Sequence, residues 1–358
     1  MKSNPKFLAS VVVGCFLIGL GWGIFSRMHP KPVLSGAAPL RVLCAQNWLD
    51  EGALRAFSAR TGVPIQLWTY SRPSELLQQM ANSDGSVDVV CTSSLLLKGL
   101  IQSHWIKKTD YSALRNLELL SVDFLHLPFD PELEYSVPLF WNLYGFFGKG
   151  ENAQKLTSWK QTWDSKRVSL WGEELQVLDV LNLFGLKIEE GLQQEEVKSL
   201  EEKVRAFVKT ASQILKPQSP HLSAEALIAK SDFIQLPLSR VARLVGENSP
   251  YQFWLPEDGG TIEVGLLAVG EKSVRPELAR ELINALISSE HALGVHKRLG
   301  AGVVHASLGH LSSIAPLQKP QALRRFPLNR FRFPDLNVEA LPRFQKIYDE
   351  SLAASNRN

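Results

Sequence analysis

The stretch "EYSVPLFWNLYGFFGK", from Glu134 to Lys149, combines the alternation of a β-strand with a proline and a run of aromatic residues. Proline has no N–H group to donate to a sheet, so Pro138 should break the strand or place it at a sheet edge. The residues after Pro138 again have the pattern of a strand. A strand that breaks and resumes is expected where the chain crosses between two structural units, so this stretch is predicted to be a hinge.

The chain before this stretch alternates between two kinds of segment. Strand-like apolar segments occupy residues 40–45, 63–70 and 87–94, and helix-like segments follow them at 50–62, 71–85 and 95–106. This alternation predicts an α/β fold with a mainly parallel sheet flanked by helices, and ligands beyond the carboxyl ends of its strands. If the first strand lies between the other two, the ligand site is bounded by residues 46–51 and 92–94.

The chain after the stretch repeats this theme with different parts. Strand-like segments at 167–171 and 232–238 alternate with helix-like segments at 173–186 and 192–215. The segment 262–270 has the pattern of a strand that returns to the first unit. Two lobes joined by such hinge strands enclose a cleft that can close on a ligand.

Composition limits the classes of function. A chain of 358 residues is long enough for about two domains. Its formal charge is only +3 and its basic residues are mixed with acidic ones, so no nucleic-acid partner is expected. The sequence lacks the motifs of nucleotide binding, metalloproteases and serine hydrolases, and its histidines lack metal-ligand spacing. Neither a metal, a cofactor nor an enzymatic activity is expected.

The N-terminus has the features of an export segment. Residues 7–25 are uncharged and about as long as the apolar core of a bilayer requires. Residues 1–26 are interpreted as an uncleaved membrane anchor, a cleaved signal peptide, or a signal that leaves a lipid on Cys15. Residues 27–39 then form a tether. All three interpretations predict a periplasmic protein, and the first tethers it to the inner membrane.

Cys44 and Cys91 each lie near the end of a strand-like segment. Export would permit a disulfide between them. Free cysteine is also commonly buried as a small apolar residue, so two buried thiols are the alternative.

Five short segments carry a resemblance to a known family. They are "QNW" at 46–48, "DVVCTSS" at 88–94, "PFDPELEYSVPLFWNLYG" at 128–145, "TSWKQTW" at 157–163 and "LPEDGG" at 255–260. Their order and intervals are similar to those of the periplasmic spermidine/putrescine-binding proteins of ABC importers. The resemblance covers nearly all of the chain after residue 40.

The resemblance implies a two-lobed type II periplasmic-binding-protein fold. The N-lobe would comprise residues 40–138 and 265–312, and the C-lobe residues 139–264 and 313–358. Members of this family bind a small-molecule solute between their lobes and deliver it to a membrane permease. This chain is expected to act in the same way, as a monomer.

The family's ligand-binding residues carry over to this chain only in part. Trp48 matches the first aromatic wall, whereas Glu51 stands where the next aromatic residue is expected and Leu95 replaces a tyrosine. An acidic pair at the start of a C-lobe helix is met by Glu173 and Gln176. Half of the pair's charge is therefore retained.

Further differences follow along the chain. Gln235 replaces a tryptophan, and Glu263 and Gly265 stand where the family has a Trp-x-Asp motif. Ser93 and Ser94 follow the third strand, where they would bind a ligand or cap the next helix. The residues expected to line the ligand site are Trp48, Glu51, Ser93, Ser94, Glu173, Gln176, Gln235 and Glu263.

These differences affect the expected ligand. A polyamine needs flat aromatic walls and charged acceptors at fixed separations, and several are missing here. Putrescine and spermidine should therefore bind weakly. Gly265→Asp should strengthen the binding of a diamine, unless Gly265 has a positive φ that an aspartate would tolerate poorly.

Two alternative functions remain at this stage. One is an enzyme on the same bilobed fold, similar to a thiaminase, with Cys91 as its nucleophile. The other is a sensory or scaffolding descendant that no longer transports. The sequence does not identify the ligand.

Overall fold

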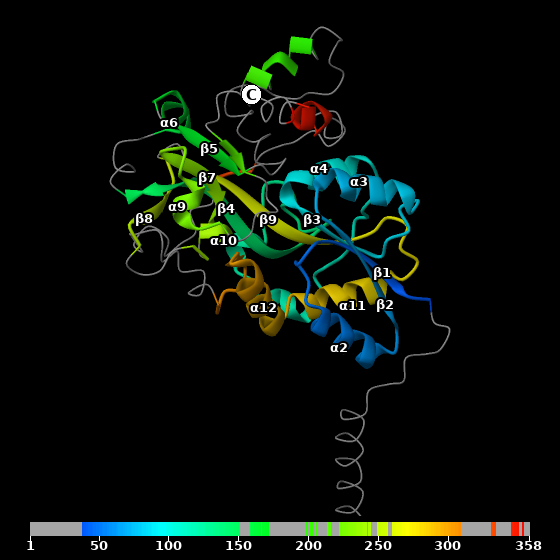
Figure 1. Cartoon of the computed structure of the whole chain (residues 1–358). Coiled ribbons are helices and arrows are strands. Elements are labelled where there is room, and N and C mark those ends of the chain that lie inside the picture. The colour runs from blue at the N-terminus through cyan, green and yellow to red at the C-terminus, as the bar shows by residue number, and fades with distance from the viewer. Residues whose placement is uncertain are drawn as a thin grey trace, which may run out of the picture.

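The computed structural model describes residues 38–150, 158–165, 167–171, 198–199, 201–203, 205–206, 213–215, 222–241, 243–244, 249–256, 260–308, 331–333, 345–350 and 353. In this part of the chain the strands form an 11-stranded sheet with the central order β2-β1-β3-β9-β4-β7-β5-β6. Figure 1 shows helices packed on both sides of it. The α/β fold predicted from the sequence is confirmed.

The first three strands form a parallel group. They are β1 (Leu40–Ala45), β2 (Ile65–Tyr70) and β3 (Val89–Ser93), and β1 pairs with both of the others. This order confirms the one on which the expected ligand site depends. The helices α2 (Glu51–Thr61), α3 (Pro73–Asn82) and α4 (Ser94–Gln102) follow the strands in turn. In Figure 1, α3 and α4 lie on one side of these strands and α2 lies on the other, beside α11 (Pro276–Leu286).

Capping residues set the ends of two helices that matter for the site. Asp50 caps α2 by accepting a hydrogen bond from a backbone N–H of the first turn at 3.1 Å, and Gly62 ends the helix with a φ of 74°. Ser288 caps α12 (Ser289–Leu299) in the same way, and Gly300 ends it with a φ of 69°.

Two long strands connect the two halves of the sheet. They are β4 (Val137–Lys149) and β9 (Gly260–Val269), which pair with each other in antiparallel orientation. Strand β9 also pairs with β3, and β4 also pairs with β7 (Phe233–Pro237). Strand β4 does not break at Pro138, contrary to the prediction. A bulge between Pro138 and Phe140 takes up the irregularity, so the strand continues.

The far half of the sheet contains shorter strands. They are β5 (Val168–Trp171), β6 (Gln213–Leu215) and β7, which are parallel to one another, and β8 (Tyr251–Trp254), which pairs with β4. Its described helices are α6 (Trp159–Ser165), α9 (Ala224–Leu227) and α10 (Leu238–Val241). Residues 213–215 form a strand although the sequence pattern assigned them to a helix, because their backbone pairs in parallel with β5.

Short elements complete the described part of the chain. They are the 3₁₀ helices η1 (Arg115–Leu119) and η2 (Val122–Phe124), and the strands β10 (Gly302–Val303) and β11 (Phe331–Arg332). Strand β10 pairs with β4 and β11 pairs with β9, so the chain returns twice to the two long strands. The guanidinium of Arg332 donates to Oγ1 of Thr261 at 2.7 Å, which fastens β11 in place.

The long strands run through the main hydrophobic core. Every residue of β9 is buried, and all of β4 except Lys149 is buried as well. A second, smaller cluster joins Phe146, Trp159, Val168 and Phe233 in the far half of the sheet. Burial of each large apolar side chain contributes about 1.5–3 kcal/mol, so the two long strands are held firmly from both faces.

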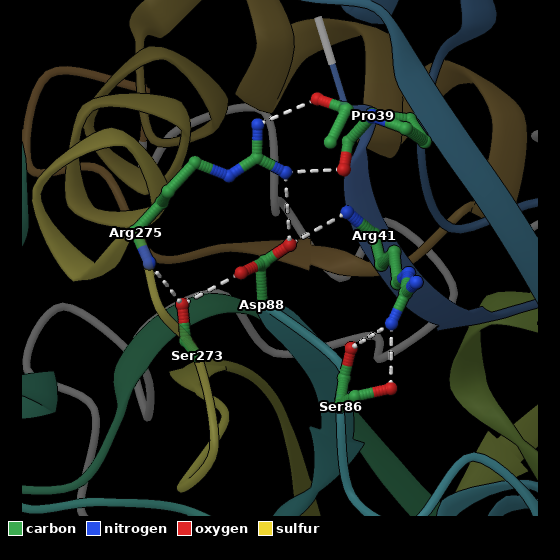
Figure 2. A network of polar contacts seen from close by, with 7 residues as sticks. Pro39, Arg41, Ser86, Asp88, Ser273 and Arg275 are labelled. Atoms are coloured by element: carbon green, nitrogen blue, oxygen red, sulfur yellow. Dashed lines mark hydrogen bonds and ion pairs between the residues drawn. The ribbon is translucent and has the colours of Figure 1, made fainter.

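A polar network fixes the amino end of β1 (Figure 2). The buried carboxylate of Asp88 accepts hydrogen bonds from the backbone N–H of Arg41 at 2.8 Å and from Oγ of Ser273 at 2.7 Å. The guanidinium of Arg275 lies 3.6 Å from the same carboxylate and donates to the carbonyl oxygens of the two residues before β1. The start of the described part is thereby bound to the loop that follows β9.

Within the described residues, no helix combines the length and the apolar character needed to cross a bilayer. The apolar segment 7–25, on which the interpretations of anchor, signal peptide and lipidated Cys15 depend, lies outside these residues.

Candidate ligand-binding site

Strand register brings polar and aromatic side chains to one face of the sheet. Glu263 on β9 lies opposite Asn142 on β4, and Gly265 lies opposite Phe140. Gln235 on β7 lies opposite Phe146, which follows Asn142 by four residues on β4. Directly opposite residues and alternate residues share a face, so all of these positions lie on the same side of the sheet. These positions lie on β9 and β4, which connect the two halves of the sheet, and on β7, the neighbour of β4. This part of the face is the candidate site.

Glu263 is the buried carboxylate of this face. The hydroxyl of Tyr144 donates to its Oε2 at 2.5 Å, and the side chain of Ser93 also forms a hydrogen bond with it. Burial raises the pKa of Glu263, and the two hydrogen bonds oppose this rise only in part. A cation placed beside the carboxylate would favour its ionised form, so the site is suited to a positively charged group.

Ser93 and Ser94 both have structural partners. Oγ of Ser93 accepts a hydrogen bond from the backbone N–H of Leu95 at 3.3 Å and caps α4. Oγ of Ser94 accepts one from the backbone N–H of Val264 at 3.0 Å. The bond of Ser94 joins the start of α4 to the middle of β9. Ser93 therefore caps a helix and also contacts the Glu263 carboxyl group.

Trp48 stands at the end of β1 on a loop that one arginine holds in place. The guanidinium of Arg298, in the last turn of α12, donates to the carbonyl oxygen of Trp48 and to Oδ2 of Asp50, each at 2.9 Å. The ring of Trp48 meets the ring of Phe140 edge to face, with 4.6 Å between centroids. Trp48 is thus positioned by α12 and placed against the start of β4.

Glu51 lies on the exposed surface of α2. Its carboxylate pairs with Arg55 at 3.2 Å, one helical turn away, and its side chain is 78% exposed. An exposed i,i+4 pair is typical of a solvated helix surface. The structure does not bring Glu51 into contact with the buried residues of the site.

Gln235 is buried in the sheet without a polar partner. Its side chain is 0% exposed, and neither atom of its amide has a hydrogen-bond partner. It lies opposite Phe146 and Leu170, both of which are apolar. An unpaired buried amide costs about 1–3 kcal/mol, so this position favours a bound polar group or a water molecule.

Glu173 and Gln176 lie outside the described residues. They follow β5, whose last residue is Trp171 and which pairs with the strand of Gln235.

Gly265 has room for no side chain. It is not among the described glycines with positive φ, so its backbone conformation would accept an aspartate. The ring of Phe140 is the obstacle, because a Cβ at position 265 would lie within 2.8 Å of three of its carbon atoms. The neighbouring Trp141 lies over Gly302 in the same way. Two consecutive aromatic residues of β4 are therefore each packed on a glycine.

The cysteines are both buried. Cys91 is 0% exposed within β3 and Cys44 is 1% exposed within β1. Burial raises the pKa of Cys44, and Cys91 is enclosed by the same sheet. Neither thiol is placed as an accessible nucleophile, so the enzyme alternative gains no support. Within the described residues, no group of three or more metal-ligating side chains is close enough to hold an ion.

The sequence alone did not single out Phe140, Tyr144 or Arg298 as parts of the site. The first two stand in the quoted aromatic stretch, which carried a signal for a hinge but none for a partner. Arg298 is one of three basic residues in the last turn of α12 and has the sequence signature of an ordinary helix end.

The chain is similar in sequence to named periplasmic binding proteins. No family model matches the chain. The spermidine/putrescine-binding periplasmic protein of Escherichia coli is 26% identical over 273 residues, which cover 71% of this chain and 75% of that protein. The protein of the same name from Salmonella typhimurium is 26% identical over 272 residues, with the same coverage.

Solved structures share the fold over most of the chain. A putative spermidine/putrescine ABC transporter from Listeria monocytogenes has a TM-score of 0.67 at 17% identity, and covers 87% of this chain and 98% of its own. Iron-bound HitA from Pseudomonas aeruginosa has a TM-score of 0.58 at 15% identity, and covers 88% and 99%. The chain therefore has the type II periplasmic-binding-protein fold and is a homologue of the spermidine/putrescine-binding periplasmic proteins.

Proposed function

We propose that the chain is the substrate-binding component of an ABC importer, which captures a small organic solute and delivers it to a membrane permease. Its homologues are periplasmic spermidine/putrescine-binding proteins. The observation that carries the proposal to this chain is the buried Glu263 carboxylate on β9, at the junction between the two halves of the sheet. A carboxylate enclosed there can bind a charged solute and link binding to movement of the two halves.

The proposed lobes comprise residues 40–138 with 265–312 and residues 139–264 with 313–358. The change of partners along the long strands supports this division. Strand β9 pairs with β3 only from Gly265 onward, and β4 pairs with β7 only from Tyr144 onward. The stretch between these pairings, where β4 and β9 pair with each other, is the proposed hinge.

The proposed ligand carries at least one ammonium or guanidinium group. Glu263 would accept its charge-assisted hydrogen bonds, and the Trp48 ring would cover its apolar part. Gln235 would supply an amide to a polar group further along the cleft. Glu173 and Gln176 stay in the proposal as further ligands from the helix expected after β5, and Ser93 holds the carboxyl group of Glu263 in position.

The proposed location of the chain is the periplasm, and its proposed partner is a membrane permease. The homologues are periplasmic by name, so we place this chain in the periplasm as well. An N-terminal anchor formed by residues 1–26 would hold it at the inner membrane, near the permease. The protein is proposed to act as a monomer, because one chain of this fold contains both lobes.

Native mass spectrometry of the protein as purified is the first test of this function. A co-purified small molecule with a basic nitrogen is expected. Calorimetry with that molecule should then show binding by the native protein and a loss of about 10-fold or more in Glu263→Gln, because a hydrogen bond to a charged group is removed. Glu51→Gln is the matched control and should bind like the native protein, since Glu51 is exposed.

Small-angle scattering separates capture between lobes from binding at a surface. A smaller radius of gyration is expected when the identified ligand is saturating, because the lobes approach each other around β4 and β9. An unchanged radius at saturation would contradict the hinge. Equal affinity of Glu263→Gln and the native protein would contradict the assignment of the site.

A further inference from the structure

The thiols of Cys44 and Cys91 face each other across two neighbouring strands. Strands β1 and β3 pair in parallel, with Val42 opposite Val89 and Leu43 opposite Val90. One residue further along this register, Cys44 lies opposite Cys91, and their side chains form a hydrogen bond. The third cysteine of the sequence is Cys15, which lies outside the described residues.

The spacing of paired strands suits a covalent bond between these residues. Neighbouring strands lie about 4.7–4.9 Å apart. A disulfide usually joins Cα atoms about 4.4–6.8 Å apart whose side chains point to the same side. Opposite residues of a parallel pair meet both conditions, so Cys44 and Cys91 can be joined without separating the strands.

The surroundings of the pair determine when such a bond can form. Both side chains are almost fully buried. The hydroxyl of Tyr70, the last residue of β2, donates to the carbonyl oxygen of Cys91 at 2.9 Å. A buried thiol with a raised pKa is a poor nucleophile, so the folded protein should react slowly. The bond would form while β1 and β3 come together during folding.

We propose that Cys44 and Cys91 are an oxidative modification site, which in the oxidised protein carries a disulfide joining β1 to β3. The oxidant is a disulfide, either of a small thiol or of an oxidoreductase. The Cys44 thiolate attacks one oxidant sulfur and releases the first thiol of the oxidant. The Cys91 thiolate then attacks the Cys44 sulfur and releases the second. The two cysteines lose two protons and two electrons, and the oxidant becomes two thiols.

The bond would act on the candidate site through the ends of these strands. Strand β1 leads into the loop of Trp48, and β3 ends at Ser93, which contacts Glu263. A disulfide beside both ends would hold these two elements of the site at a fixed separation. It would also close a long loop of the unfolded chain, which is where a disulfide stabilises most in the chain-entropy description.

The test uses the full chain with Cys15→Ser, so that two thiols remain. The protein is unfolded in detergent and denaturant, and refolded either with a mixture of oxidised and reduced glutathione or with dithiothreitol. Free thiols are then alkylated in denaturant with N-ethylmaleimide and counted by intact mass. The glutathione sample is expected to take up no label and the dithiothreitol sample to take up two, with a Cys44–Cys91 peptide in the digest of the first.

Thermal unfolding provides the second measurement. Oxidation should raise the unfolding temperature of Cys15→Ser by several degrees. Cys44→Ala and Cys91→Ala, each combined with Cys15→Ser, lose packing but should show no difference between the two refolding conditions. The proposal would be overturned if the glutathione sample refolds, as shown by cooperative thermal unfolding, and still takes up two labels in denaturant. A mixed disulfide with glutathione in place of the Cys44–Cys91 peptide would also overturn it.

Exported protein that is precipitated with acid in whole cells and alkylated in denaturant checks the same pair without refolding. Unlabelled Cys44 and Cys91 that become reactive only after reduction are the expected result. Two labels before reduction would contradict the proposal for the exported protein. This readout requires no bound solute, so it stands or fails separately from the importer function.

Discussion

The ring of Phe140 lies over the Cα atom of Gly265 and fills the space that a side chain at position 265 would occupy. The aspartate expected there from the family resemblance is therefore replaced by a glycine and also by the aromatic ring that packs on it. Trp48 in turn meets Phe140 edge to face. The ring fills the space that a carboxylate at position 265 would need, so a substitution at that position alone will not restore the carboxylate.

Gly265→Asp alone is predicted to destabilise the protein and to leave diamine affinity unimproved. The new Cβ would lie within 2.8 Å of three carbon atoms of the Phe140 ring, and such overpacking costs about 1–3 kcal/mol. Combined with Phe140→Ala, the aspartate would have room, and diamine affinity should rise about 10- to 100-fold relative to Phe140→Ala alone. Calorimetry with putrescine, with thermal unfolding of each variant, checks both parts. Submicromolar binding of putrescine by the native protein would show that the existing site already suffices.

The unliganded protein is predicted to lose stability as pH rises through the pKa of Glu263. The pKa is raised by burial, so between the usual carboxyl value of about 4.3 and the raised value the folded state binds more protons than the unfolded state. Stability from this group is present below that range and is lost above it. Denaturant midpoints measured between about pH 4 and pH 8 should fall less steeply in Glu263→Gln. Identical slopes in the variant and the native protein would contradict this role of Glu263.

Arg298→Ala is predicted to weaken solute binding although Arg298 is not expected to touch the solute. It removes the hydrogen bonds that fix the Trp48 loop, at a cost of about 1–3 kcal/mol in stability. Trp48 should become more mobile, which tryptophan fluorescence quenching can detect. Arg55→Ala removes an exposed ion pair with Glu51 and is the matched control, with an expected change within about 0.5 kcal/mol. A large effect in both variants would indicate a general loss of charge instead.

Asp88→Asn is predicted to destabilise the protein by about 3 kcal/mol. The Asp88 carboxylate is buried and joins Arg41, Ser273 and Arg275. An asparagine would leave the Arg275 charge without its partner and turn an NH₂ group toward one of the two hydrogen-bond donors. Asp84→Asn is the control, because Asp84 pairs with Lys272 while its side chain is 92% exposed. Urea unfolding of both variants gives the comparison. Equal midpoints would mean that the network in Figure 2 contributes little to folding.

Much of the fold could be predicted because it depends on local signals. The first three strands alternate with capped helices, which predicts a parallel sheet with right-handed connections. The position of β1 between β2 and β3 entered only as a condition for the ligand site, and the structure has that order. Strand β6 was missed because three residues at the end of a helix-like segment are too short a run to indicate a strand. The continuity of β4 through Pro138 was also missed, since a bulge depends on the partner strand and not on the strand itself.

The candidate site was harder to predict because its contacts are distant in the sequence. Tyr144 and Glu263 are 119 residues apart, and the register of β4 with β9 brings them together. The same register sets Phe140 against Gly265. Comparison of single positions with a family pattern shows that Gly265 lacks a carboxylate, but it cannot show which neighbouring ring has taken the space.

The contacts of Arg275 determine where the tether, residues 27–39, would join the folded protein. They fix the two residues before β1 at the amino end of that strand, whereas Trp48 lies beyond its carboxyl end. The strand has 6 residues and spans about 20 Å. If residues 1–26 stay in the membrane, the protein is attached at the end of β1 opposite the candidate site. The protein must then rotate so that the candidate site faces the permease before it can deliver the solute. Residues 27–39 reach at most about 45 Å when extended, so shortening them should lower the effective concentration of correctly turned protein at the permease.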